Sequence, residues 1–574
     1  MFAKTAGKGL VENLLAWGVD HIYGLPGDSI NNLMEEFRKE KDRIRFIQVR
    51  HEETAALAAS SYAKLTGKVG VCLSIAGPGA IHLLNGLYDA KADGAPVLVL
   101  AGQISTPHLG RDDFQEVHLE RMFADVSVYN ERAAAAEELP ELLNQAIRTA
   151  YAKKGVAILT IPDDLPGKKG KRNPRATSPT YTESVSIPQE EDLTEALGMI
   201  RSAKKPLILA GKGCLGAQEE LDAFAEKAAA PVILALAGKG ALPDEHPYNL
   251  GQLGQIGTKP AYEAMEETDL LLLLGTSFPY REYLPEDVLA VQLDIDPSQI
   301  GKRYPVEVGL VGDAGTTLRW LTGHLERKEE RNFLEKCQKR MADWRKGLAE
   351  DEALEEGSPI RPAQVIAQLR KVVDRDAVLS VDVGNVTVWM TRHFPVSDQK
   401  WVISSWLATM GCGLPGALAG KIAWPERQTV AVCGDGGFTM VMQDFLTAVK
   451  YQLPILVVVL NNEKIGMIQY EQQVMGNLEF GTELEGFDFA RFAELCGGIG
   501  FRVENSCELA PALEQAAAVG KPALVDVCIE DQPPLPGKIT YAQAAGYAKH
   551  MIKRLFKNGR VELPPIRKGL KHLT

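Results

Sequence analysis

The chain lacks several features that mark special classes of protein. It has eight cysteines in 574 residues but no C-x-x-C pair, so neither a zinc site nor a disulfide framework is expected. No apolar run approaches the roughly 20 residues that a membrane-spanning helix needs. The N-terminus also shows no apolar segment followed by a small-residue cleavage site. We therefore expect a soluble, cytoplasmic protein.

Positive charge is scarce over most of the chain. Lys and Arg number 63 against 75 Asp and Glu, a net charge of −12, which argues against nucleic acid as a partner. The end of the chain differs: residues 549–574 hold eight basic residues and one acidic residue, a net of +7. Such a basic tail predicts either contact with an anionic surface or packing on the acidic body.

The remaining composition is that of a globular protein, with 45% apolar and 24% charged residues. Short β-branched or leucine-rich runs alternate with amphipathic stretches, the pattern of α/β proteins with doubly wound parallel sheets. At roughly 150 residues per domain, the length suits three large domains of this kind. The predicted strands are Val69–Ser74, Pro96–Ala101, Val156–Ile161, Pro206–Ala210, Leu270–Leu274, Val291–Ile295, Ala377–Val381, Thr429–Cys433, Pro454–Leu460 and Ala523–Cys528.

Two stretches without strand signals divide the chain. Residues 167–190 are rich in Lys, Ser, Thr and Pro and predict a linker, and Glu326–Ser358 is charge-dense and predicts a helix. The sequence analysis therefore places domains at 1–166, 190–325 and 356–530, followed by a tail at 531–574.

The first and third domains share a local pattern. Each has a strand, a Gly-rich loop, a helix, a proline and a second strand, with 19 positions from Gly77 to Pro96 and 20 from Gly434 to Pro454. Either the chain contains two copies of one doubly wound unit, or two unrelated strand–helix–strand units look alike.

Polar residues follow two strands of the third domain. Gly434-Asp435-Gly436 ends one strand, and after 24 residues Asn461-Asn462 ends the next. Glycines after a strand let backbone N–H groups approach a phosphate, and the following helix N-terminus favours negative charge. Carboxylate and amide oxygens suit Mg²⁺. The pair of strand ends predicts a divalent ion on a diphosphate, whereas G-D-G alone is also typical of a solvated turn.

This spacing resembles the motif of the thiamine-diphosphate-dependent enzymes, G-D-G-x(24–27)-N-N, and the resemblance covers nearly the whole chain. It implies that Asp435, the Asn462 side chain and the Lys464 carbonyl hold Mg²⁺ against the diphosphate. It also implies that residues 462–468 wrap the cofactor and that Met410 lies beneath it, where the alternative is an ordinary core methionine. The three domains would be a pyrimidine-binding domain, a Rossmann-like middle domain and a diphosphate-binding domain.

An Ala-rich helix of the first domain begins at Glu52. A carboxylate is favoured there by the helix dipole alone. The resemblance implies more: Glu52 bonds N1′ of the aminopyrimidine and shares the proton that activates C2, since shielding from water can raise the pKa of a carboxyl group. Gly24–Gly27 and Gly77–Gly79 match the family's loops around this ring. Because Glu52 and Asp435 would face one cofactor from different subunits, the resemblance implies a homodimer or homotetramer.

Further residues distinguish members of the family. The chain has no His-His pair, which aldehyde-releasing decarboxylases use. Acetohydroxyacid synthases have Trp five residues after the Gly of G-M-x-x-x-W, whereas Gly466-Met467 is followed by Glu471 at that position, as in pyruvate oxidases. Phe114-Gln115 also resembles the oxidases' D-x-F-Q-E segment, which has a counterpart in the synthases. Glu471 therefore favours a flavin-dependent pyruvate oxidase or quinone-linked pyruvate dehydrogenase.

The middle domain contains a formal G-x-G-x-x-G at Gly211–Gly216. No acidic residue ends a strand about twenty residues later, which argues against a nicotinamide site. The segments 275–280, 292–297 and 312–313 instead resemble the FAD-binding domain of pyruvate oxidases. That resemblance implies that Asp294 accepts from the adenosine ribose or a nearby amide, and that residues 254–257 lie near the flavin pyrophosphate. Synthases also bind FAD here, and a block without a ligand is the other alternative.

The tail contains a predicted basic amphipathic helix at Tyr547–Asn558. Such a helix can lie on an anionic membrane surface or pack on the acidic body. Its sequence resembles the carboxyl end of quinone-dependent pyruvate dehydrogenases, which dock on the membrane, although the last eleven residues depart from that ending.

Together these resemblances imply oxidative decarboxylation of pyruvate, with thiamine diphosphate, Mg²⁺ and FAD, to acetate or acetyl phosphate and CO₂. The electrons would pass to quinone or O₂; an acetohydroxyacid synthase and a non-catalytic cofactor binder are the alternatives. The predicted catalytic residues are Glu52, Phe114, Gln115 and Glu471. The residues predicted for thiamine diphosphate and magnesium are Met410, Asp435, Gly436, Gly437, Asn462, Lys464, Ile465, Gly466 and Met467. The residues predicted for FAD are Gly254, Gln255, Ile256, Gly275, Thr276, Ser277, Phe278, Pro279, Tyr280, Asp294 and Asp313.

Overall fold

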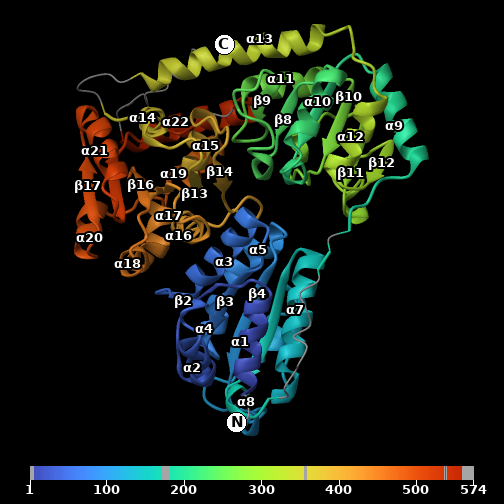
Figure 1. The fold of residues 1–574 in the computed structure, drawn as a ribbon. Coiled ribbons are helices and arrows are strands. Elements are labelled where there is room, and N and C mark those ends of the chain that lie inside the picture. The colour runs from blue at the N-terminus through green and yellow to red at the C-terminus, as the bar shows by residue number, and fades with distance from the viewer. Residues whose placement is uncertain are drawn as a thin grey trace.

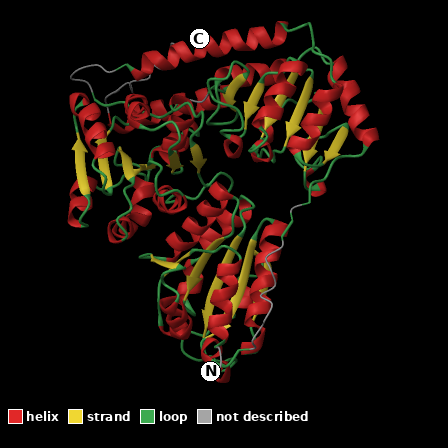
Figure 2. Ribbon diagram, in the orientation of Figure 1, coloured by secondary structure: helices red, strands yellow, loops and turns green. Residues whose placement is uncertain are grey.

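The computed structural model describes residues 5–170, 181–182, 184–353, 359–534, 537 and 539–558. Within them lie three parallel six-stranded sheets, each flanked by helices (Figures 1 and 2). The N-terminal domain is the lower lobe of Figure 1, the middle domain the right-hand lobe and the C-terminal domain the left-hand lobe. The predicted fold class, three doubly wound parallel-sheet domains, is confirmed.

The N-terminal sheet has the order β2-β1-β3-β4-β6-β5. Its strands are β1 (His21–Gly24), β2 (Arg45–Gln48), β3 (Gly70–Ser74), β4 (Val97–Gln103), β5 (Ser127–Arg132) and β6 (Val156–Pro162). Its helices are α1 (Ala6–Ala16), α2 (Asn31–Lys39), α3 (Glu52–Thr66), α4 (Pro78–His82), α5 (Leu84–Ala92), α6 (Leu119–Met122), α7 (Leu139–Lys153) and α8 (Asp164–Gly167).

The C-terminal sheet repeats that order as β14-β13-β15-β16-β18-β17. Its strands are β13 (Val378–Val381), β14 (Lys400–Val402), β15 (Thr429–Gly434), β16 (Leu456–Asn461), β17 (Ile499–Val503) and β18 (Ala523–Cys528). Its helices are α14 (Pro362–Val372), α15 (Asn385–His393), α16 (Gly413–Ala423), α17 (Asp435–Val441), α18 (Phe445–Lys450), α19 (Gly466–Val474), α20 (Phe489–Leu495), α21 (Ser506–Ala518) and α22 (Tyr541–Asn558). The N-terminal and C-terminal domains therefore share one topology over all six strands, which goes beyond the single strand–helix–strand unit that the sequence pattern covers.

The middle sheet has a different order, β12-β11-β10-β7-β8-β9. The strand order reverses between β7 and β10, the place where doubly wound sheets form a ligand crevice at their carboxyl edge. Its strands are β7 (Pro206–Ala210), β8 (Val232–Leu234), β9 (Asn249–Gln252), β10 (Leu270–Leu274), β11 (Leu289–Asp294) and β12 (Val308–Val311). Its helices are α9 (Glu190–Ser202), α10 (Gln218–Ala228), α11 (Lys259–Glu267) and α12 (Ala314–His324), and α13 (Asn332–Glu352) leads to the C-terminal domain across the top of Figure 1.

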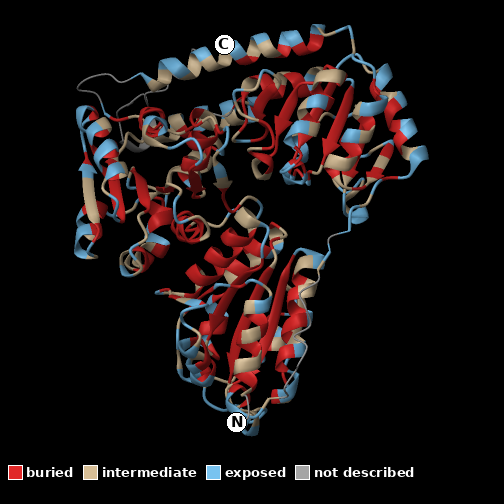
Figure 3. Ribbon diagram, viewed as in Figure 1, coloured by how far each residue is buried: buried red, intermediate tan, exposed pale blue. Residues whose placement is uncertain are grey.

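Burial on both faces explains why the strands read as continuous apolar runs. All residues of β4, β6 and β10 are buried, and Figure 3 shows the sheets as the buried centre of each lobe. The ten predicted strands are therefore present, with ends that shift by one or two residues. β11, for example, ends at Asp294 rather than Ile295, and β16 begins at Leu456 rather than Pro454.

A buried ion-pair network joins the N-terminal and C-terminal domains. Lys64 Nζ of α3 lies 2.7 Å from Asp89 Oδ2 and 2.5 Å from Asp93 Oδ2. Burial opposes the charge on Lys64, but the two carboxylates outweigh it and raise the pKa of the amine. Ser405 Oγ of the C-terminal domain donates to Asp93 Oδ1 at 2.5 Å. α3, which begins at Glu52, is thus anchored at its far end to the C-terminal domain.

The described part of the tail packs on the C-terminal domain. The His550 ring nitrogen Nδ1 of α22 lies 2.6 Å from the Asn477 carbonyl oxygen, and Lys553 Nζ donates to the Gly476 carbonyl at 2.7 Å. These carbonyls directly follow α19. None of the helices in the described ranges is long and apolar enough to cross a membrane. Residues 559–574, with the end of the basic tail, and 171–180 of the predicted linker lie outside the described residues.

Candidate active site

The carboxyl edge of the C-terminal sheet carries a buried carboxylate. β15 ends at Gly434, so Asp435 opens α17 at that edge, only 4% exposed. Asp435 Oδ1 accepts from the Gly436 N–H at 2.9 Å, whereas Oδ2 is buried without a hydrogen-bond partner in the described part of the chain. Burial raises the pKa of Asp435 to about 6, against the opposing effect of the N–H groups of Gly436 and residues 462–464.

The end of the next strand, β16, faces the same place. Asn462 follows β16, and its Nδ2 donates to Asp531 Oδ1 at 3.4 Å. Lys464 Nζ donates to Asp531 Oδ2 at 2.8 Å. Glu463 between them has φ 57°, a left-handed turn that reverses the chain there. Asp531 thus contacts two of the three predicted metal-site residues, Asn462 and Lys464, which the sequence alone did not reveal.

Predicted cofactor residues surround Asp435 closely. A Cβ at Gly436 would lie 3.3 Å from Met410 Cε and 4.0 Å from Ile465 Cγ1. A Cβ at Gly466 would lie 3.2 Å from Asn462 Nδ2. The structure therefore brings these five residues together, as predicted, and Met410 lies beside the G-D-G turn. Met467, the next residue of α19, is half-buried.

Asp382 is a second buried carboxylate at this edge. It follows β13, is fully buried, and accepts from the N–H groups of Gly411 at 2.8 Å and Gly413 at 3.3 Å. A Cβ at Gly437 would lie 2.9 Å from its carboxyl group. Burial raises the pKa of Asp382 to about 6. Asp382 thus ties the loop that follows Met410 to the helix that begins at Asp435.

Asn385 adds a polar group from the same strand end. Gly384 has φ 126°, which glycine adopts readily, and Asn385 then opens α15. Its Oδ1 is buried without a partner among the described residues, and its Nδ2 would lie 2.6 Å from a Cβ at Gly466. The sequence D-V-G-N after a predicted strand was the signal for both residues, because this strand ends at the same edge as β15 and β16.

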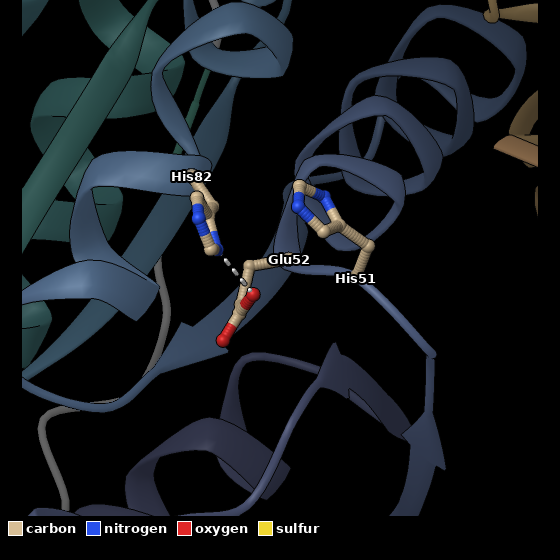
Figure 4. A group of neighbouring side chains, drawn as sticks. All are labelled: His51, Glu52 and His82. Atoms are coloured by element: carbon tan, nitrogen blue, oxygen red, sulfur yellow. Dashed lines mark hydrogen bonds and ion pairs between the residues drawn. The ribbon is translucent and has the colours of Figure 1, made fainter. Parts of the chain in front are cut away.

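The carboxyl edge of the N-terminal sheet carries Glu52 with two histidines (Figure 4). Glu52 opens α3, is 5% exposed, and its Oε2 lies 3.0 Å from His82 Nδ1. The His51 and His82 rings stack with centroids 4.4 Å apart. His51 Nδ1 instead accepts from the Glu53 N–H at 3.3 Å and caps α3. His82, which ends α4, was not predicted; its signal was a histidine one turn after Gly77–Gly79.

The loop that carries Phe114 and Gln115 lies beside Glu52. A Cβ at Gly77 would lie 2.9 Å from the Gln115 carbonyl oxygen, and one at Gly79 would lie 2.9 Å from Glu52 Oε1. Gln115 has φ 63°, and Phe114 is 82% exposed. The Gly77–Gly79 segment therefore packs against Gln115 at one end and Glu52 at the other, while Phe114 is largely exposed.

Glu471 lies on α19 of the C-terminal domain. Its charge acts on Tyr280, whose pKa is raised mainly by burial and further by the charges of Glu282 and Glu471. A Cβ at Gly254 would lie 3.6 Å from Tyr280 Cδ2 and 3.9 Å from Phe278 Cζ. Gly254 thus lies beside the rings of Phe278 and Tyr280, and Glu471 is near enough for its charge to act on Tyr280.

The remaining predicted flavin residues lie at the carboxyl edge of the middle sheet. A Cβ at Gly213 would lie 2.8 Å from Gly275 Cα, so the loops after β7 and β10 touch through their backbones. Thr276 Oγ1 is buried without a partner among the described residues. Asp294 ends β11, where burial raises its pKa. Ser277 and Pro279 are exposed after β10.

Two further observations qualify the flavin prediction. Asp313 Oδ1 accepts from the Thr316 N–H at 2.8 Å and caps α12, a structural role. Arg392 of α15, which was not predicted, donates to the carbonyl oxygens of Gln255 at 3.2 Å, Ile256 at 3.3 Å and Gly257 at 2.8 Å. Burial lowers its pKa to about 10. This guanidinium holds the predicted flavin loop against the C-terminal domain.

Comparison with known families agrees with this arrangement domain by domain. The model of the N-terminal TPP binding domain of thiamine pyrophosphate enzymes matches residues 4–122, that of the central domain 193–321, and that of the C-terminal TPP binding domain 382–527. The chain belongs to the thiamine pyrophosphate enzyme family. Thiamine pyrophosphate is another name for thiamine diphosphate.

Relatives of this chain include proteins named for two different reactions. The "Putative thiamine pyrophosphate-containing protein YdaP" of Bacillus subtilis is 59% identical over 100% of both chains. The pyruvate oxidase of Lactiplantibacillus plantarum is 38% identical over 93% of this chain and 90% of its own. The acetolactate synthase of Mycobacterium bovis is 31% identical over 92% and 88%.

The C-terminal edge suits the family's cofactor. The unpartnered buried Oδ2 of Asp435 is a ready site for a cation, because an unsatisfied buried carboxylate oxygen is costly. Gly436 and Gly437 let the start of α17 approach a diphosphate closely. The residues present therefore fit thiamine pyrophosphate with Mg²⁺.

The two halves of the site lie in separate domains of one chain. Glu52 bonds His82 of its own domain, and Asp435 bonds Gly436 of its own domain. Within the described residues, no hydrogen bond or ion pair joins Glu52 or His82 to Asp435. Close to Glu52 the two domains are nevertheless joined, because Asn85 Nδ2 donates both to Glu53 Oε1 at 2.6 Å and to Thr409 Oγ1, beside Met410, at 2.8 Å.

Proposed function

We propose that this thiamine pyrophosphate enzyme oxidatively decarboxylates pyruvate to acetate or acetyl phosphate and CO₂, and passes the electrons through FAD to quinone or O₂. The observation that carries the proposal is Glu471, which stands where synthases have Trp and whose charge acts on Tyr280 of the middle domain. Similarity to a pyruvate oxidase at 38% identity, against 31% for a synthase, supports the same choice.

In this proposal the C-terminal domain holds the cofactor. The Asp435 carboxylate, the Asn462 amide oxygen and the Lys464 carbonyl bind Mg²⁺, and the buried, unpartnered Asp435 Oδ2 supports that role. When bound, thiamine diphosphate supplies the electron sink for loss of CO₂, and FAD supplies the two-electron acceptor. Met410 supports the cofactor from the side of the G-D-G turn.

Glu52 is the acid–base residue of the proposed reaction. Its buried carboxyl group holds a proton at N1′ of the aminopyrimidine and takes it back, which makes C2 reactive. Gln115 and Phe114 contact the substrate from the same edge, and Glu471 acts from α19. The packing of Gly77 against Gln115 and of Gly79 against Glu52 supports this shared location.

The middle domain fits FAD. The close approach of Gly213 and Gly275 leaves backbone groups open to a pyrophosphate, and the unpartnered Thr276 Oγ1 provides a buried polar contact. Asp294 at the end of β11 accepts from the adenosine part, and residues 254–257 with Phe278 and Tyr280 flank the flavin. Asp313 contributes through its cap on α12.

We further propose that the working unit is a homodimer or a pair of dimers. The family resemblance supports this, because it implies that Glu52 and Asp435 face one cofactor from different subunits. The domain limits proposed are 1–166, 190–325 and 356–530. The tail at 531–574 gives a cytoplasmic protein the means of a peripheral contact with a membrane, through its net positive charge.

Anaerobic flavin reduction tests the function. The purified protein, loaded with thiamine diphosphate, Mg²⁺ and FAD, is mixed with pyruvate without O₂, and flavin absorbance near 450 nm is followed. We expect bleaching, then recovery with a quinone analogue or with O₂. Acetate and acetyl phosphate are then measured with and without phosphate.

A flavin that stays oxidised contradicts the proposal. In that case acetolactate formed from pyruvate without any electron acceptor would identify the synthase reaction, which the 31% identical relatives favour. The control omits thiamine diphosphate. If pyruvate reduced the flavin directly, the flavin would bleach in this control as well.

A further inference from the structure

The Glu52 carboxyl group has one side-chain partner among the described residues, and that partner is an imidazole. His82 Nδ1 lies 3.0 Å from Glu52 Oε2, while Gly79 leaves room beside Oε1. The Glu52 side chain is 6% exposed, and that of His82 is 43% exposed in the single chain. His82 therefore connects a buried carboxyl group, to which Figure 4 shows it bonded, with a partly exposed position in the single chain.

The neighbouring histidine has a different task. His51 Nδ1 accepts from the Glu53 N–H and caps α3, and His51 stacks on the His82 ring without bonding Glu52. The other charged groups nearby are Glu53, 3.9 Å from His51 Nδ1, and Asp444 of the C-terminal domain, which feels the charge of His51. Of the two imidazoles, only His82 is placed to exchange a proton with Glu52.

We propose that His82 is a positioning residue and the proton-exchange partner of Glu52. Neutral His82 accepts the Glu52 proton on Nδ1 and releases its Nε2 proton to water; the reverse transfer returns a proton to Glu52. No other bond changes, and the charge moves with the proton. His82 also holds Oε2, so that Oε1 is presented to the ring. The inference rests on the proposed role of Glu52 and extends it with a route for the proton.

Hydrogen–deuterium exchange at C2 of bound thiamine diphosphate tests this without substrate or flavin reduction. The holoenzyme with Mg²⁺ is mixed with D₂O and quenched at increasing times, and the remaining C2 proton is measured by NMR between pD 5.5 and 8.5. His82→Asn keeps an N–H donor near the position of Nδ1 but cannot take up a proton. His51→Asn is the matched control, because Asn caps helices well.

We expect His82→Asn to slow exchange about 10- to 100-fold, within the range of general acid–base effects, and to change its pD dependence. The affinity for thiamine diphosphate should stay within about threefold by calorimetry, as expected for a residue that does not hold the cofactor. Imidazole added to His82→Ala should restore part of the rate. His51→Asn should exchange within about threefold of the unmodified protein, since its cap is kept.

Two outcomes overturn the inference and can be told apart. If Glu52→Gln slows exchange but His82→Asn does not, the role of His82 fails while that of Glu52 stands. If Glu52→Gln exchanges at the unmodified rate, the proposed role of Glu52 fails, and the inference with it. A third result would leave His82 with only a structural role. In it, His82→Asn slows exchange without altering its pD profile, and imidazole does not speed exchange in His82→Ala.

Discussion

The N-terminal and C-terminal domains share one strand order but present different groups at the same edge. The N-terminal edge has one buried carboxyl group, Glu52, which is paired with an imidazole. At the C-terminal edge Asp382 and Asp435 are buried carboxyl groups, and burial raises the pKa of each to about 6. The shared strand order thus places polar groups at the same edge of both sheets. The residue types at the strand ends then determine whether an edge is suited to proton exchange or to cation binding.

The pairing of the carboxylates explains this division. Asp382 accepts from backbone N–H groups and stiffens its surroundings, whereas Asp435 Oδ2 has no partner in the described residues. An unpaired buried charge calls for a counter-ion. Glu52 instead has a partner that can titrate, so we expect its carboxyl group to exchange a proton. The predictions below test whether the N-terminal edge exchanges protons and the C-terminal edge binds a cation.

The largest difference is expected in turnover. Glu52→Gln removes the proton acceptor of the N-terminal edge, so turnover of pyruvate should fall about 10²- to 10⁴-fold. Thiamine diphosphate and FAD should remain bound, which calorimetry and the flavin spectrum check. Glu53→Gln is the matched control, because Glu53 follows in the helix but accepts from Asn85 instead. Near-normal turnover in Glu52→Gln would mean that the N-terminal edge does not carry the acid–base step.

The C-terminal edge should show the opposite pattern, a loss of affinity. Asp435→Ala removes the proposed direct metal ligand, and because outer-shell changes already cost about 10- to 100-fold, affinity for thiamine diphosphate with Mg²⁺ should fall about 100-fold or more. Calorimetric titration measures it. Asp488→Ala, which removes a helix cap of the same domain, is the control. Unchanged affinity in Asp435→Ala would place the cation elsewhere.

The sequence predicted the frame of these edges well. Ten buried strands were recognisable because continuous apolar runs are needed where both faces of a parallel strand are covered. The G-D-G turn, Asn462 and Glu52 could be found because each stands directly beside a predicted strand or helix end. Since parallel strands end at a common edge, order along the chain was enough to predict their neighbours.

The remaining groups depend on contacts between distant segments. Asp531 reaches Asn462 from 69 positions away, and Arg392 reaches Gly257 from 135. No local pattern marks such pairs. His82 was hidden for another reason: a histidine at the end of a short helix is ordinary until Glu52 is seen 3.0 Å away.

An intermediate effect is expected where the C-terminal domain holds the flavin loop. Arg392→Met removes three donated hydrogen bonds to residues 255–257. Charged hydrogen bonds contribute about 1.5–3 kcal/mol each when intact, so FAD affinity should fall about tenfold or more by fluorescence titration. Arg370→Met, which loses a surface pair with Glu352, is the control. If thiamine diphosphate affinity falls equally, Arg392 supports the whole C-terminal edge rather than the flavin loop.

The smallest effect concerns stability without the cation. The pKa of Asp435 lies near 6 in the folded chain, against an ordinary value of 3.8. Its contribution to stability is therefore present below pH 4 and is lost as the pH rises through 6. Without Mg²⁺ at pH 7.5, Asp435→Asn should stabilise the C-terminal domain by about 1–3 kcal/mol. That raises its unfolding midpoint by about 2–4 °C per kcal/mol.

Calorimetric unfolding in EDTA at pH 7.5 and pH 4 checks this difference, because the gain should disappear at the lower pH. Glu52→Gln provides the contrast between the two edges: it removes a carboxylate that already has the His82 partner, so no gain is expected. If Asp435→Asn lowers the unfolding midpoint at pH 7.5, neighbouring groups already stabilise the Asp435 carboxylate when no cation is bound. The buried carboxyl groups of both edges would then be stabilised by protein neighbours, and only the measured affinity for thiamine diphosphate with Mg²⁺ would support a cation site.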